Sequence, residues 1–210
     1  MTPPDQTPDP SSWTDPAPDR PVPLWKSLAA DVTAHVPIPL RNRSRLGWTW
    51  LTIVVLVRSS GFHVTLLYRL AHAIRPRLGP IGKVVAAALF WMVRHGYGCS
   101  IASTSRLHGG LILPHPQGIV IGGGVVTGPR TFIYQNVTIG GSPGKDGLPS
   151  IGSDARIYAG AVISGPILLG DNVMIGANAV VARDVPDRSI VRSPMAEVVA
   201  ITEKYLSEGV

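Results

Sequence analysis

The sequence has a single cysteine, few aromatic residues and no long hydrophobic run. Cys99 alone cannot form an intramolecular disulfide or a thiolate metal cluster, so nothing argues for an oxidising compartment. Aromatic residues make up 6% of the 210 residues and charged residues 15%. Two uncharged, mostly apolar stretches, 46–57 and 84–93, fall well short of the roughly 20 residues that a helix needs to span a bilayer. We therefore expect a cytoplasmic protein.

Charge is distributed unevenly along the chain. Residues 1–23 hold eight prolines and four Asp against one Arg, which predicts a disordered tail and does not resemble a secretory signal. Residues 24–99 contain ten Lys or Arg against Asp31 alone, and residues 100–210 are neutral, so the net charge of +6 comes from the middle segment. We predict four segments: the tail 1–23, a basic α-helical segment 24–99, a β-domain 100–194 and a short helix or tail 195–210.

The basic segment is predicted to contain two or three helices. Apolar residues in 62–74 fall at helical spacing, the alanines at 86–88 favour a second helix, and the prolines at 76 and 80 separate the two. Two interpretations remain open. The arginines are solvated or contact partner subunits, or they belong to an amphipathic surface, within 41–94, that rests on anionic lipid at the inner face of the membrane. No nucleic-acid motif is present, and we expect no nucleic-acid partner.

Aliphatic residues return at every sixth position in the C-terminal half of the chain. A six-residue cycle fits neither a helix nor a simple strand and indicates a parallel β-helix of hexapeptide repeats, with three hexapeptides in each coil. One break is expected, because fourteen residues separate Val137 from Ile151 where twelve would keep the register. The positions are Ile101, Leu107, Leu113, Ile119, Val125, Thr131 (the polar exception), Val137, Ile151, Ile157, Ile163, Leu169, Ile175 and Val181.

Glycine is concentrated in the same region. Sixteen of the 23 glycines lie between residues 109 and 176, next to Asn and Asp in phrases such as LGDN at 169–172 and IGAN at 175–178. Glycine and asparagine tolerate the positive φ angles that tight corners require. The glycine content therefore indicates corners between short strands.

Four motifs carry a family resemblance: GIVIG at 118–122, QNVTIGG at 135–141, IYAGAV at 157–162 and IGANAVVARDVP at 175–186. Together with the repeats they resemble the left-handed β-helix acyltransferases, closest to the serine O-acetyltransferases. The resemblance implies a mainly β fold, a left-handed parallel β-helix preceded by a small α-helical segment. It also implies an O-acetyltransferase that uses acetyl-CoA as the acyl donor without a metal, assembled as a homotrimer or a dimer of trimers.

The resemblance assigns the general base to His115. In this family, a histidine just before the GIVIG-type block deprotonates the acceptor hydroxyl. Histidine suits the task because its pKa lies near neutrality. The chain has five other histidines, and on residue type alone His115 is equally well read as one more imidazole on the surface of a coil. His108 has no counterpart in the family and is expected to be structural.

The acceptor site departs from the family at four positions. Family members that act on serine have Asp where this chain has Pro114 and Ser100, and an Arg-His pair where it has Gly147 and Leu148. A zwitterionic amino acid needs charged partners, and the loss of a buried hydrogen-bonding partner costs about 1–3 kcal/mol. A sugar or glycan hydroxyl, or that of another small-molecule alcohol, is therefore the first expectation. A serine O-acetyltransferase of cysteine biosynthesis and a non-catalytic β-helix scaffold are the alternatives.

The residues that contact the acyl donor in the family are better preserved in this chain than those of the acceptor site. In the family, acetyl-CoA lies in a groove between the coils of two subunits and contacts backbone amides and small residues. By position the resemblance implies eight residues at this groove, each of which is also explained by the packing and turns of the coil. They are Gly140, Gly141, Ala159, Gly160, Gly176 and Ala177, with Lys145 and Arg183 as partners of the phosphates.

Overall fold

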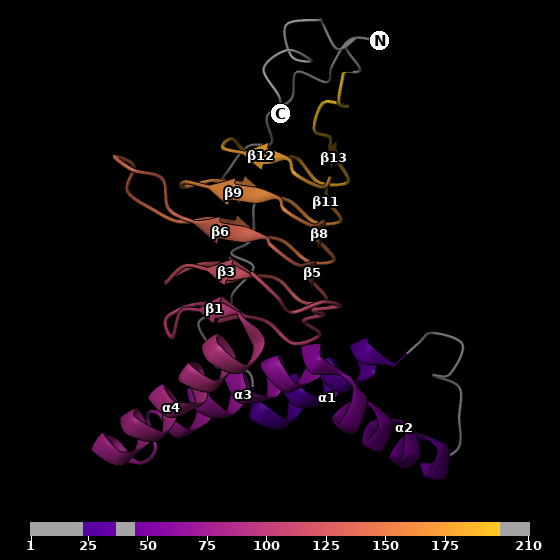
Figure 1. Ribbon diagram of the computed structural model, residues 1–210, viewed down its shortest axis with the longest axis vertical. Coiled ribbons are helices and arrows are strands. Elements are labelled where there is room, and N and C mark those ends of the chain that lie inside the picture. Colours follow the sequence, from indigo (N-terminus) through magenta and orange to yellow (C-terminus); the bar gives the residue numbers. More distant parts are fainter. Residues whose placement is uncertain (1–22, 37–44, 198–210) are drawn as a thin grey trace, which may run out of the picture.

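The computed structural model describes residues 23–36 and 45–197, and within them four helices precede a column of short strands (Figure 1). The helices are α1 (Leu24–His35), α2 (Arg45–Arg58), α3 (Ser60–Ile74) and α4 (Gly79–Tyr97). The sequence predicts two or three helices in this segment, and that number is too low, because four are present in the described residues. The predictions for residues 1–22 and 198–210 lie outside the described residues.

Local sequence explains where α3 and α4 begin and end. The Ser59 side chain accepts a hydrogen bond from the Phe62 amide and caps α3. Pro80 lies in the first turn of α4, where its missing N–H leaves no intrahelical bond unmade. Gly98 ends α4 with φ 65°, a left-handed conformation that favours glycine. The chain then enters the first strand.

The strands form three parallel sheets, which are the three faces of a β-helix. Sheet A contains β1 (Ser100–Ile101), β3 (Val120–Ile121), β6 (Thr138–Gly140), β9 (Val162–Ser164) and β12 (Val180–Val181). Sheet B contains β2 (Arg106–Leu107), β4 (Val126–Thr127), β7 (Ser150–Ile151) and β10 (Leu168–Leu169). Sheet C contains β5 (Phe132–Ile133), β8 (Arg156–Ile157), β11 (Met174–Ile175) and β13 (Ile190–Val191). The hexapeptide β-helix that the repeat predicts is confirmed.

The predicted register is wrong in the middle of the repeat. Ile121, and not Ile119, pairs with Ile101 in sheet A, and Thr127 pairs with Leu107 in sheet B. The reason is that each hexapeptide turns two side chains inward, one on the strand and one two residues before it. Ile119 and Ile121 are both buried, so both sets follow a period of six. From Ile119 to Val137 the period read from the sequence follows the inward residues that lie two positions before the strand residues.

Two coils are longer than the regular eighteen residues that separate Ile121 from its partner Ile139. Ile101 and Ile121 lie twenty residues apart, and the two extra residues fall between Ile112 and Val120. Gly140 pairs with Ser164, twenty-four residues on, and the six extra residues lie within the nine-residue loop 141–149, which stands away from the coils (Figure 1). We call the first irregularity the 112–120 bulge and the second the 141–149 loop.

The helices form a layer across the N-terminal end of the β-helix (Figure 1). Asp31 of α1 is fully buried and accepts hydrogen bonds from Arg69 of α3 (3.0 Å) and from the amides of Gly110 (2.7 Å) and Leu111 (3.1 Å). Arg69 also donates to the carbonyl oxygen of His108 (2.6 Å). This ion pair therefore joins two helices to the first coil.

No single helix in the described ranges is long and apolar enough to cross a membrane. The helices Thr49–Arg58 and Ser60–Ile74 meet at a bend of 92°. Together, but not singly, they have the length and apolar composition of a membrane span.

Candidate functional site

The 112–120 bulge carries His115. Because the bulge has two residues more than a regular coil, its chain cannot follow the corner of the coils on either side, and the imidazole of His115 is exposed. Two contacts fix the backbone of the bulge, one from Cys99 and one from α3. The Cys99 thiol donates to the carbonyl oxygen of Pro116 (3.0 Å), and Gly61 of α3 lies so close to the carbonyl oxygen of Leu113 that any β-carbon would clash. The two extra residues of the bulge thus leave the His115 side chain exposed on a backbone that is held in place.

His115 lies at a hollow of about 790 Å³ between α4 and the first coils. That volume is within the usual range for small-molecule sites. No lysine, arginine or carboxylate among the described residues lines it, and the lining comes from the start of α3, the end of α4 and the corners that precede β3 and β6. The lining residues are Ser60, Gly96, Tyr97, Gly98, His115, Pro116, Gln117 and Gln135.

Two side chains in this hollow were not identified from the sequence. The Gln135 side-chain oxygen is buried and has no hydrogen-bond partner among the described residues, so it is available to a donor on a bound molecule. The Tyr97 hydroxyl lies 3.2 Å from Nδ1 of His63, whose Nε2 bonds to the carbonyl oxygen of Leu56. Since a carbonyl only accepts, Nε2 carries the proton and Tyr97 donates to Nδ1. The tyrosine oxygen keeps its lone pairs for a ligand.

The other five histidines are all engaged by carbonyl oxygens. His35, His72, His95 and His108 each bond through Nδ1 to a backbone carbonyl, and His63 does so through Nε2. Burial lowers the pKa of both His35 and His72. Within residues 23–36 and 45–197, His115 alone has no hydrogen bond to its ring. It is therefore the histidine whose two nitrogens are open to substrate.

Other chemistries find little support in the described part of the chain. Burial raises the pKa of the Cys99 thiol to about 11, so it remains protonated near neutral pH and is a poor nucleophile. No group of three His, Cys, Asp or Glu among the described residues is arranged to hold a metal ion. Proton transfer at His115 is the reaction that this arrangement favours.

Comparison with known proteins places this geometry in a family. The family described as bacterial transferase hexapeptide (six repeats) matches residues 149–183. A serine acetyltransferase of Helicobacter pylori is 39% identical over 137 residues, which cover 64% of this chain and 78% of that protein. One from Synechococcus elongatus is 36% identical over 174 residues, which cover 81% of this chain and 67% of that protein. The chain belongs to the serine acetyltransferase family.

Solved structures agree with this assignment. The serine acetyltransferase of Neisseria gonorrhoeae in complex with serine superposes with a TM-score of 0.67 at 32% identity and covers 83% of this chain and 68% of that one. The serine acetyltransferase of Brucella abortus gives a TM-score of 0.68 at 30% identity, covering 86% and 70%. The chain is an acyltransferase, and acetyl-CoA is its co-substrate, as the resemblance implies.

The acetyl-CoA residues implied by the serine acetyltransferase resemblance lie at two opposite edges of sheet A. Its strands start at the edge that holds His115, and we call this the His115 edge. Ala159, Gly160, Gly176 and Ala177 form corners there, where the Asn178 amide bonds to the Ala159 carbonyl oxygen. Gly140, Gly141, Lys145 and Arg183 lie where the strands of sheet A end, and we call this the loop edge. One chain does not bring the two groups together.

Packing distinguishes some of these glycines. A β-carbon on Gly176 would lie 2.9 Å from the carbonyl oxygen of Val191, and Gly160 has φ 71°, so coil geometry explains both. A β-carbon on Gly140 would meet no atom within 4 Å. Packing within the chain does not require a glycine at 140, and its open backbone suits a ligand that approaches closely.

We predict that Gly140→Val raises the KM for acetyl-CoA by roughly tenfold, equivalent to about 1.4 kcal/mol, with an unchanged melting temperature. Steady-state kinetics and thermal unfolding measure the two quantities. Gly176→Val is the matched control and should lower the melting temperature, because its side chain meets backbone. An unchanged KM in Gly140→Val would remove this residue from the donor site.

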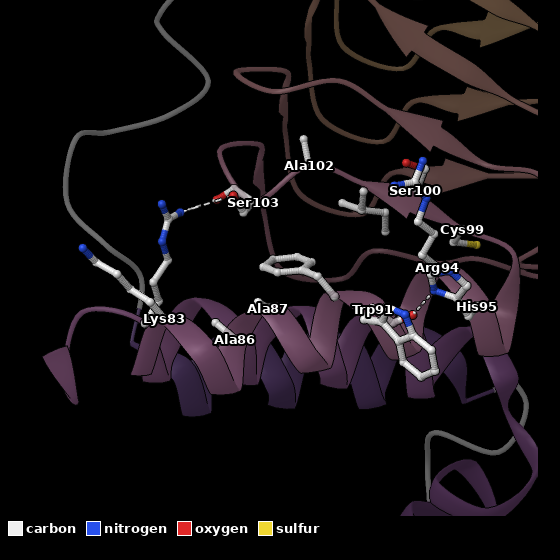
Figure 2. Close-up of a pocket in the computed structure, with 13 residues that line it drawn as sticks. Lys83, Ala86, Ala87, Trp91, Arg94, His95, Cys99, Ser100, Ala102 and Ser103 are labelled. Atoms are coloured by element: carbon white, nitrogen blue, oxygen red, sulfur yellow. Dashed lines mark hydrogen bonds between the residues drawn. The ribbon is translucent and has the colours of Figure 1, made fainter. Parts of the chain in front are cut away.

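Pro114 directly precedes His115 in the chain, but none of the four positions where the chain departs from the family lines the His115 hollow. Ser100 lines a second hollow, of about 560 Å³, between α4 and the first coil, with Arg94 and Cys99 beside it (Figure 2). Leu148, in the 141–149 loop, packs against the hydrophobic core, and a β-carbon on Gly124 would clash with it. An apolar contact within the chain therefore occupies the position that the resemblance matches to the histidine of the Arg-His pair.

Proposed function

We propose that this protein transfers the acetyl group of acetyl-CoA to an acceptor hydroxyl, with His115 as the general base. The observation that carries the proposal is the exposed ring of His115, open at both nitrogens, beside a hollow that hydroxyl and amide side chains help to line. Acetyl-CoA supplies a thioester carbonyl. His115 accepts the hydroxyl proton as the hydroxyl oxygen attacks that carbonyl, and it returns the proton to the sulfur of the departing coenzyme A. Atoms and charge balance without a metal.

L-serine is the first acceptor that we propose. The relatives described above carry the name serine acetyltransferase, and the gonococcal structure was determined with serine. This ranks serine ahead of the sugar hydroxyl that the sequence placed first. The side chain of Gln135 and the hydroxyl of Tyr97 offer acceptors to the ammonium group of serine at the His115 hollow.

A sugar hydroxyl is the second candidate acceptor, and the lining of the hollow favours it. Among the described residues, no carboxylate, lysine or arginine lines the His115 hollow, whereas hydroxyl and amide groups do. Such groups suit the hydroxyls of a sugar, while the carboxylate of serine lacks a cationic partner there. Leu148, packed on the core, adds to this preference.

One assay distinguishes these acceptors. Thiol release from acetyl-CoA is followed with L-serine, with neutral monosaccharides and with L-alanine, which lacks the hydroxyl and serves as the control. A kcat/KM for serine above that for every sugar supports the first proposal, and the reverse order supports the second. No thiol release with any acceptor, and no binding of acetyl-CoA, would contradict acetyl transfer and favour the scaffold alternative.

The division of the donor residues between two edges of sheet A supports a trimer. Lys145 at the loop edge and His115 at the other edge lie at opposite ends of the same strands, so they meet only if a neighbouring subunit brings its loop edge to this His115 edge. Closed rings arise from such heterologous contacts. A monomeric mass in sedimentation equilibrium at assay concentration would contradict this assembly.

A further inference from the structure

Tyr97, the last residue of α4, lines the His115 hollow and is held there by two other helices. Its hydroxyl lies 3.2 Å from Nδ1 of His63 in α3, and Nε2 of the same ring bonds to the carbonyl oxygen of Leu56 in α2. The two rings tilt by 59° with their centroids 6.1 Å apart, and the tyrosine packs against the hydrophobic core. These contacts fix the position of the tyrosine oxygen.

The direction of this hydrogen bond decides what the tyrosine oxygen can bind. Since Nε2 of His63 donates to a carbonyl oxygen, Nδ1 is left as an acceptor, and the proton of the Tyr97 hydroxyl points toward it. The tyrosine oxygen therefore offers only lone pairs to the hollow. If His63 were replaced by a residue without an acceptor, the hydroxyl proton could turn toward the hollow and meet a bound donor with the wrong polarity.

Gln135 provides a second acceptor in the lining of the same hollow. Its side-chain oxygen is buried and has no hydrogen-bond partner among the described residues. Its backbone is fixed by the coils, because the Gln135 carbonyl oxygen accepts a hydrogen bond from the Gly160 amide (3.0 Å). A buried acceptor without a donor lowers the stability of the fold, and a bound donor would remove that cost. The hollow thus has two acceptors on fixed supports.

An ammonium group suits these two acceptors better than a hydroxyl does. It carries three N–H donors and no acceptor, whereas a hydroxyl has one proton to donate. Hydrogen bonds from a charged donor are also roughly twice as strong as those between neutral groups. No lysine or arginine among the described residues lines the hollow to pair with a carboxylate. This chain therefore offers a site for an amine beside the reacting hydroxyl and no partner for an acid group.

We propose that the acceptor is a small amino alcohol whose ammonium group binds Tyr97 and Gln135, with His63 as the positioning residue that keeps the tyrosine oxygen an acceptor. L-serine belongs to this class, but its carboxylate is not the group that the hollow recognises. A sugar without an amino group falls outside the class. The inference rests on the proposed acetyl transfer to a hydroxyl and deepens it by naming the class of acceptor.

Acceptors that share a three-carbon skeleton test this class with the full-length protein. Serinol, glycerol and 1,3-propanediol carry an ammonium, a hydroxyl and no donor at the central carbon, and L-serine is serinol with a carboxylate in place of one hydroxymethyl group. Thiol release should give a kcat/KM for serinol at least about tenfold above that for glycerol and within about threefold of that for L-serine. Equal values for serinol and glycerol would overturn the proposal. So would a value for L-serine more than about tenfold above that for serinol, because a cation from outside this hollow would then bind the carboxylate.

Substitutions at Tyr97 and His63 test the positioning. Tyr97→Phe should raise the KM for serinol roughly tenfold and leave kcat and the KM for acetyl-CoA unchanged. His63→Leu should raise the same KM about fivefold, and His63→Asn, whose amide oxygen can replace Nδ1 as the acceptor, should restore most of the affinity. In the Tyr97→Phe background His63→Leu should add nothing, because it acts through the tyrosine hydroxyl. Tyr158→Phe, outside the lining of the hollow, is the matched control.

Binding measured without turnover separates this inference from the proposed function. In calorimetric titration, serinol should bind the native chain more tightly than glycerol, and Tyr97→Phe should reduce that difference. If this order holds but no acceptor gives thiol release, acetyl transfer is contradicted while the amine site stands. If serinol and glycerol bind equally, or if Tyr97→Phe behaves as Tyr158→Phe does, the proposal is overturned even where acetyl transfer is observed.

Discussion

Replacing His115 by alanine is expected to lower the rate of acetyl transfer by about 10²- to 10⁴-fold, the usual contribution of a positioned general base. The loss should appear in kcat, because the imidazole takes up the proton only as the acceptor hydroxyl attacks. His115 is exposed and its ring makes no hydrogen bond within the described residues, so its removal leaves no buried group unpaired. The fold and the affinity for acetyl-CoA should therefore be unchanged.

Thiol release, circular dichroism and calorimetric titration with acetyl-CoA measure these three quantities. The matched control is His95→Ala, which removes an exposed imidazole near the end of α4 that stacks on Trp91. That variant should retain the native rate. A His115→Ala enzyme within about twofold of the native rate would show that another group takes the proton, or that the proton passes directly to water.

The sequence predicted the β-helix because its core repeats at a fixed interval. A period of six survives any single irregular residue, and Thr127 and Thr131 both point inward without disturbing it. The register was harder to predict, because strand and corner positions are both buried and both repeat at six. Only the pairing of Ile101 with Ile121 shows that two residues are inserted near His115. The two inserted residues that shift the six-residue period also expose His115, the proposed general base.

The motifs did not identify the remaining lining of the hollow as a site, although Gln135 is the first residue of the QNVTIGG motif. Tyr97, Gln117 and Gln135 lie 20 and 18 residues apart, each three residues before a strand of sheet A, and they come together because successive turns of the chain stack at one corner, whereas His115 lies in the two-residue insertion beside them. Equivalent corner residues therefore recur at the length of a coil, and this interval is the signal that relates Tyr97, Gln117 and Gln135. The uncharged character of the hollow depends equally on side chains that lie outside any motif.

In the helical layer, the sequence identified a notable residue but not its partner. Charge counting identified Asp31 as the lone acidic residue of a segment with ten basic ones, but it did not identify a partner. Arg69 lies 38 residues away on another helix, and the two amides that bind the same carboxylate lie in the first coil. A lone carboxylate among many cations is a reasonable candidate for burial in an ion pair, since a buried charge must be paired.

Asp31→Ala is expected to reduce the free energy of unfolding by about 3–5 kcal/mol, the usual cost of breaking a buried ion pair by removing one partner. The Arg69 guanidinium, 7% exposed as a residue, would remain charged in the core, and the amides of Gly110 and Leu111 would lose their acceptor. Because this coil leads directly to the 112–120 bulge, acetyl transfer should fall as the helices separate from it. Denaturant unfolding followed by circular dichroism measures the stability.

A double substitution distinguishes loss of the pair from loss of packing. Asp31→Leu with Arg69→Met removes both charges and keeps side-chain volume, so it should be less destabilising than Asp31→Ala alone, because no unpaired charge remains. Asp187→Ala is the matched control: its carboxylate also accepts a backbone amide, that of Asp171 (2.8 Å), but at an exposed corner. We expect it to cost about 1 kcal/mol or less. If Asp31→Ala costs no more than this control, Asp31 does not hold the helical layer on the β-helix, and the apolar packing of α3 against the first coil does so instead.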